Sequence, residues 1–139
     1  MIQRLQTLWL LLGAFFTALT FKFSFYNGSI LNSSNQIYSA KLSAQFNLLT
    51  LVVTSILLAI IVVDIFLFKN RRLQLRLTIL GLIISIADIV YYFSKIKTFA
   101  NGELSLSSLF YFVVPILLFL AARGIWRDQK LIKSLDRLR

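Results

Sequence analysis

The sequence of 139 residues contains no cysteine and no histidine. Without cysteine there is no disulfide exchange, no thiolate nucleophile and no iron–sulfur ligation. Without histidine there is no axial imidazole for haem, no usual zinc site and no ordinary serine–histidine catalysis. Acidic residues number 5 and are scattered along the chain, so a metal site built from carboxylates alone is not expected either. We therefore expect no enzyme activity and no cofactor.

Apolar side chains are what the sequence has in excess. The hydrophobic fraction is 58%, with 13 Phe, and the charged fraction is 14%, against about 25% in soluble proteins. A chain this short has one modest core, which cannot hide so much apolar surface from water. The composition therefore predicts a membrane protein.

Four apolar stretches lie between the charged residues, and each is long enough to cross a bilayer. A hydrocarbon core of about 30 Å needs ~20 residues of helix. We expect membrane-spanning helices over residues 5–26, 44–68, 75–94 and 104–122. The predicted fold class is all-α: a single domain of four transmembrane helices, followed over residues 123–139 by a basic amphipathic cytoplasmic helix.

The connections between these stretches are polar. Residues 27–45 are rich in Asn and Ser and predict a polar loop, and Asn101-Gly102 predicts a turn. Asp64 lies near the end of the second span, so we expect a salt bridge at the membrane surface with Lys69, Arg71 or Arg72.

Basic residues are unevenly distributed, and this distribution predicts the orientation. The chain has 15 Lys and Arg and a net charge of +10. Arg4, four residues of the 69–76 connection and six of the tail make 11 of the 15, all on the side that both termini share. The positive-inside rule places that side in the cytoplasm. Most of the positive charge is thus explained by the orientation of the chain in the membrane. We therefore expect no DNA binding and do not favour RNA binding.

Asp88 is an acidic residue inside the third expected span. Such a residue is costly in a membrane unless it is paired or hydrated. Lys22 lies at a similar depth of the first span, so we expect the two to form an interhelical ion pair. In the alternative, Lys22 extends to the surface while Asp88 accepts a hydrogen bond from a hydroxyl or from Tyr91 or Tyr92. In a third interpretation Asp88 is a proton-coupling site.

The tail predicts a helix with one apolar side and one basic side. Such a helix is typical of segments that lie on an anionic membrane surface or dock on a partner. The candidate residues for cytoplasmic contact with lipid or a partner lie at both ends of the chain: Gln3, Arg4, Arg127, Lys130, Lys133, Arg137 and Arg139.

Both ends of the chain also resemble a known family. The opening MIQRLQT, followed by three leucines, and the closing DQKLIKSLDRLR are similar to a bacterial membrane-protein family, domain of unknown function 4293. Members of the family often have Tyr or Phe where this chain has Trp9, and Glu where it has Gln129. The resemblance covers the whole chain and implies a four-helix inner-membrane protein of bacteria. It implies no activity and no catalytic residue.

The sequence leads to three hypotheses about function. The first is a non-catalytic accessory subunit of a larger inner-membrane complex, which contacts other membrane proteins through its spans and cytoplasmic ends. The second is a small proton- or cation-coupled transporter that uses Asp88. The third is a membrane-anchored adaptor whose basic tail contacts lipid or RNA.

Overall fold

The structure, a computed structural model, describes residues 2–31, 37–68, 70–99 and 101–136. Within these ranges the chain forms four α-helices and three short β-strands. In chain order they are α1 (Ile2–Lys22), β1 (Tyr26–Leu31), β2 (Ile37–Leu42), α2 (Leu48–Phe66), α3 (Arg71–Ile96), β3 (Asn101–Leu104) and α4 (Ser108–Asp136).

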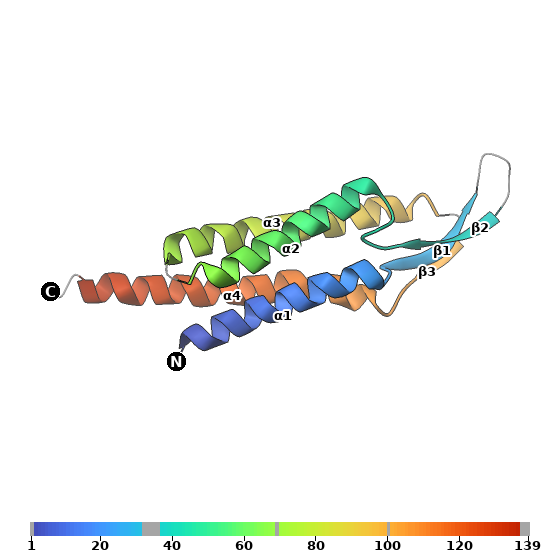
Figure 1. The fold of residues 1–139 in the computed structure, drawn as a ribbon. Helices are drawn as coiled ribbons and strands as arrows, with labels where there is room; N and C mark the ends of the chain where they lie inside the picture. Colours follow the sequence, from blue (N-terminus) through green and yellow to red (C-terminus); the bar gives the residue numbers. More distant parts are fainter. Residues whose placement is uncertain (1, 32–36, 69, 100, 137–139) are drawn as a thin grey trace.

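The four helices form a bundle in which each packs against two others. α1 and α3 both pack against α2 and α4, so the four contacts close into a ring. Both termini lie at one end of the bundle, which we call the terminal end, and the strands lie at the other, the sheet end (Figure 1). All four helices are long and apolar enough to cross a membrane. The predicted number of four spans is confirmed, but their bounds differ: α1 ends at Lys22 and not at residue 26, because the chain enters β1 there. By the length and composition of its helices, the chain is a multi-pass membrane protein.

The three strands form an antiparallel sheet that the sequence analysis did not predict. Their order is β2-β1-β3, so β1 is central. The expected polar loop over 27–45 is therefore wrong, because most of its described residues pair as β1 and β2. The expected turn at Asn101-Gly102 is wrong as well, because both residues lie in β3 and pair with β1. The fold is thus helical with a small sheet rather than all-α.

Two glycines let β1 and β3 approach each other. Gly28 pairs with Gly102 across the two strands. A Cβ atom on Gly102 would lie 2.5 Å from the backbone oxygen of Asn27 and 2.6 Å from both the Cα atom of Gly28 and the ring of Tyr26. These positions need glycine because the opposite backbone and an aromatic ring occupy the space of a side chain.

An aromatic cluster joins the sheet to the helices. Phe25, which directly precedes β1, is fully buried and stacks on Tyr92 of α3 at 5.2 Å between ring centroids. Tyr111 of α4 contacts both rings edge-on, at 5.1 and 5.0 Å. Aromatic pairs in these geometries stabilise a fold by more than the burial of their apolar area alone. The sheet is therefore anchored to α3 and α4 where it meets the bundle.

The basic tail is a continuation of the fourth span as far as the structure describes it. α4 runs from Ser108 to Asp136 as one helix, which extends beyond the other three at the terminal end (Figure 1). Ile125 and Asp128 are buried, so this part of the tail packs inside the bundle. A separate helix lying on the membrane surface is therefore not what residues 123–131 form.

We predict that Gly102→Ala disrupts the pairing of β1 with β3. The added methyl group has no room, so we expect a loss of about 1–3 kcal/mol in the free energy of unfolding in mild detergent. Amide hydrogen exchange at residues 26–29 should become faster, because these residues pair with β3. Glu103→Ala is the matched control, since Glu103 is an exposed neighbour in the same strand. Unchanged exchange at 26–29 in Gly102→Ala would contradict this account.

Candidate functional site

Each helix turns a strip of buried residues, spaced alternately by three and four, toward the bundle axis. The strips are Gln6, Leu10, Gly13, Thr17 and Thr20 on α1; Thr50, Thr54, Leu57, Ile61 and Asp64 on α2; Gln74, Thr78, Gly81, Ser85, Asp88 and Tyr92 on α3; and Tyr111, Val114, Leu118, Ala121, Ile125 and Asp128 on α4. This spacing is a repeat of 3.5 residues, which is typical of helices packed at about +20°. Many of these residues are polar, whereas the outward faces carry large exposed apolar side chains. The candidate site is therefore the polar interior of the bundle.

At the terminal end, one cluster joins three helices. The Gln6 side-chain amide donates to Asp128 Oδ2 at 2.7 Å, and its oxygen accepts from Arg71 Nη1 at 2.8 Å. Arg71 Nη1 also lies 3.7 Å from Asp128 Oδ2, and both side chains are nearly buried. We call these three residues the Arg71 cluster. It holds the start of α3 against both α1 and α4.

Gly124 makes room for this cluster. A Cβ atom at Gly124 would lie 2.9 Å from Gln6 Cγ and 3.4 Å from Gln6 Nε2. The glycine of α4 therefore lets the Gln6 side chain lie flat against the α4 backbone, where it reaches Asp128.

One turn deeper, a second cluster joins α2 to α3. The Thr78 hydroxyl donates to Asp64 Oδ2 at 2.5 Å, and Gln74 Nε2 donates to the backbone oxygen of Asp64 at 3.1 Å. The expected surface salt bridge of Asp64 is wrong for Arg71 and Arg72, because Asp64 is buried and Arg71 pairs with Asp128. Lys69, its third expected partner, lies outside the described residues.

An apolar layer separates this region from the sheet end. It consists of buried residues that form one packed cluster: Leu10, Leu57, Ile61, Val114, Leu118 and Ala121. Gly81 adds no side chain here, and a Cβ atom at Gly81 would be in ordinary contact with Leu57 and Leu118. The layer divides the polar interior into two parts.

Asp88 lies on the sheet side of the apolar layer. Its Oδ2 accepts a hydrogen bond of 3.3 Å from the Thr54 hydroxyl. Beside it is a void of about 10 Å³, which Thr17, Thr20 and Ser85 also line. A void of this size holds about one water molecule. Asp88 is therefore enclosed by hydroxyl groups of its own chain and has no room for a larger ligand.

The expected ion pair of Lys22 with Asp88 does not form. Lys22 is exposed, whereas Asp88 is buried, and the ion pair found among the described residues is Arg71–Asp128. Lys22 follows Thr20 by two residues, which places it about 200° around α1 from the buried strip. The alternative arrangement, with Asp88 bound to a neighbouring hydroxyl and Lys22 directed outward, is the one observed.

The candidate contact residues at the chain ends are placed as follows. Arg127 and Lys130 are exposed on α4. Gln3, Arg4 and Lys133 lie in helices, but the positions of their side chains are outside the description, and Arg137 and Arg139 lie outside the described residues altogether.

Sequence reasoning missed the residues that hold the terminal end together. Gln6 and Gln74 were not considered, and Arg71 and Asp128 counted as surface charges of a loop and a tail. The signal that could have found them is the spacing of three and four, because it continues from the apolar residues into Gln6 and Asp128. Among the described residues, no three acidic side chains gather where they could hold a metal ion.

The fold and the polar interior define a class of protein, a four-helix membrane bundle with a small sheet at one end. Comparison with protein families then gives its membership. The chain belongs to the family described as domain of unknown function (DUF4293), whose model matches residues 2–138. This confirms the resemblance of the two chain ends. No curated protein and no solved structure matches the chain.

We predict that Gly124→Ala and Gly13→Ala have opposite effects. Replacing glycine by alanine within a helix gains about 0.5–1 kcal/mol where space is free. At Gly13 the nearest atom to a new Cβ would be 4.0 Å away, so we expect stabilisation. At Gly124 the methyl group would displace Gln6, and we expect a net loss of about 1–2 kcal/mol as its hydrogen bonds break.

The measurement is the free energy of unfolding in mild detergent, and Gln6→Ala provides the control. In a Gln6→Ala background there is no side chain to displace, so the cost of Gly124→Ala should vanish. Equal stabilisation by both glycine substitutions in the otherwise unchanged chain would show that Gln6 does not depend on Gly124.

Proposed function

We propose that the protein is a non-catalytic accessory subunit of a larger membrane assembly, and that the β1–β2 hairpin is one of its contacts. The observation that carries this proposal is the exposure of apolar side chains on β2. Ile37 is 73% exposed and Tyr38 is 49% exposed. In β2 these side chains point to opposite faces, so in the described part of the chain both faces of the strand's outer end carry an exposed side chain.

The position of these residues supports contact with protein rather than with lipid. Leu42, at the other end of β2, is fully buried against the bundle. Ile37 is five residues further along, which is roughly 17 Å of extended strand. The hairpin projects away from the helices along the long axis of the molecule (Figure 1). Ile37 and Tyr38 would therefore lie beyond the membrane surface, in water, unless a partner covers them.

The edge of the sheet adds to this argument. β2 is an outer strand of the sheet, because in the described part of the chain it pairs with β1 alone. An open edge strand offers backbone donors and acceptors to a further strand, and natural proteins protect such edges. A partner strand added to β2 would satisfy these groups and cover the apolar side chains.

The interior of the bundle supports a structural role. Gln6, Arg71 and Asp128 bind one another, and Asp88 binds Thr54. Polar contacts of this kind set the register of membrane helices and do not require a substrate. The bundle then acts as a scaffold that presents the hairpin at one end and a basic helix at the other.

The orientation and location belong to the same proposal. The exposed Arg127 and Lys130 lie at the terminal end, as does the basic start of α3. The positive-inside rule would place this end in the cytoplasm and the hairpin on the opposite side. We propose the bacterial inner membrane, with the basic residues of α4 close to anionic lipid.

The test is purification of the full chain from its native membrane in mild detergent. We expect stoichiometric partner chains in the wild type. The double substitution Ile37→Ser and Tyr38→Ser should reduce their recovery by about tenfold or more, as expected for loss of an apolar contact centre. The unfolding midpoint should not change, because both side chains are exposed.

Lys41→Ser is the matched control, since Lys41 is an exposed polar residue of the same strand. It should leave partner recovery intact. A wild-type chain that purifies alone and monodisperse would contradict the accessory function.

A second candidate function, proton- or cation-coupled transport, is favoured by one observation. Two buried acidic residues, Asp64 and Asp88, lie on opposite sides of the apolar layer, on the neighbouring helices α2 and α3. Each is bound by a threonine hydroxyl of the other helix. A carrier of protons could use two such groups, provided that the apolar layer opens between them.

Asp88→Asn distinguishes the two functions. The amide can still accept the hydrogen bond from Thr54, so the fold should persist. In vesicles with an imposed membrane potential and a pH-sensitive dye inside, an accessory subunit should show no flux above empty vesicles in either form. Proton flux in the wild type that Asp88→Asn abolishes, and that the control Glu103→Gln retains, would establish transport.

A further inference from the structure

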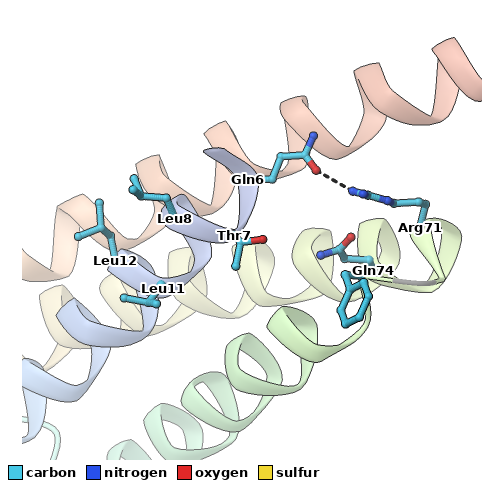
Figure 2. A pocket seen from close by; sticks show the side chains of 8 residues that line it. Gln6, Thr7, Leu8, Leu11, Leu12, Arg71 and Gln74 are labelled. Atoms are coloured by element: carbon cyan, nitrogen blue, oxygen red, sulfur yellow. Dashed lines mark hydrogen bonds between the residues drawn. The ribbon is translucent and has the colours of Figure 1, made fainter. Parts of the chain in front are cut away.

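A cavity of about 580 Å³ opens at the terminal end of the bundle, where α1 faces the start of α3. Pockets that bind small molecules are usually of about 300–1,000 Å³. Figure 2 shows the polar side chains Gln6, Arg71 and Gln74 toward one end of this cavity, with leucines of α1 toward the other. The cavity thus has a polar end and an apolar end.

The apolar end faces the side of the bundle. Leu8, Leu11 and Leu12 of α1 line it. Leu8 and Leu11 are 49% and 57% exposed, so the cavity is open where lipid would surround the helices. An apolar chain could enter from the membrane without crossing water.

The polar end offers both donors and an acceptor. Arg71 uses Nη1 for Gln6 and Asp128, and in the described part of the chain no hydrogen bond engages its other two nitrogens. Gln74 lies one turn further along α3, is 2% exposed, and its Oε1 is buried without a hydrogen-bond partner. An unpaired buried acceptor is unusual and costly. The cavity therefore fits a ligand that carries an acceptor for Arg71 and a donor for Gln74.

We propose that this cavity binds one phospholipid of the leaflet at the terminal end. Its phosphate accepts hydrogen bonds from Arg71, and an ammonium or hydroxyl group of its head donates to Gln74 Oε1, while an acyl chain lies along the leucines of α1. Arg72 and Arg76 are exposed on the same turns of α3 and add positive charge that favours a phosphate over a neutral head. This lipid site goes beyond the accessory function and does not depend on it.

The experiment is native mass spectrometry of the full chain, delipidated in detergent and titrated with four lipids of matched acyl chains. Phosphatidylethanolamine and phosphatidylglycerol carry both a phosphate and a donor, phosphatidylcholine lacks the donor, and diacylglycerol lacks the phosphate. We expect one lipid per chain, with the first two bound about tenfold more tightly than the other two, because each of the latter leaves one polar group unpaired.

Two substitutions locate the site. Gln74→Leu removes the unpaired acceptor, so it should abolish the preference for phosphatidylethanolamine over phosphatidylcholine. A purely structural role of Gln74 would weaken both lipids equally. Leu8→Trp fills the apolar end and should reduce binding about tenfold. Leu73→Trp is its matched control, since Leu73 is 47% exposed at the same end and does not line the cavity.

Three results would overturn the proposal. Equal binding of all four lipids would mean a non-specific lipid shell. The absence of a retained lipid would mean that the cavity is not a lipid site. Displacement of phosphatidylglycerol by millimolar glycerol phosphate alone would identify a soluble phosphate ester as the ligand.

Discussion

The structure depends on one constraint: polar groups inside a bilayer must find their partners within the protein. The Arg71 cluster meets this constraint where the helices begin and end, because a single glutamine accepts from Arg71 and donates to Asp128. These three residues come from three different helices. The contact therefore sets the lengthwise register of α1, α3 and α4, which apolar packing in a lipid solvent would specify less strongly.

The same constraint explains the division of the interior. Polar side chains occupy both ends of the buried strips, and an apolar layer around Leu57 and Leu118 lies between them. The two buried acidic residues, Asp64 and Asp88, are thus kept apart, and each is bound by a threonine of the neighbouring helix. This arrangement suits a rigid scaffold, which is why the exposed hairpin carries the proposed function and the closed interior does not.

The sequence predicted the elements whose signal is local. The four spans follow from the long apolar runs. The expectation that Asp88 has a partner follows from the cost of an acidic residue within such a run. A hydroxyl partner of Asp88 was foreseen only as an alternative and Thr54 was not named, because depth along a helix does not say which way a side chain points. Lys22 lies at a similar depth but on the outward side of α1. The hydrogen bond to Asp88 comes instead from Thr54, a neutral residue of α2.

The sheet and the cavity are the parts that tertiary structure alone decided. β1 and β3 pair across more than 70 residues of chain, and the pairing rests on two glycines, of which Gly28 lay in the expected polar loop and Gly102 in the expected turn. The cavity exists because Arg71 and Gln74, which lie within the expected basic connection, meet leucines of a helix far away in the sequence. The sequence by itself determined that this chain belongs in a membrane, through its composition, and how many times it crosses, through its apolar runs, since transfer into lipid depends on each segment separately. Which polar groups meet inside depends on how the segments are rotated and paired, and that is a property of the assembled bundle.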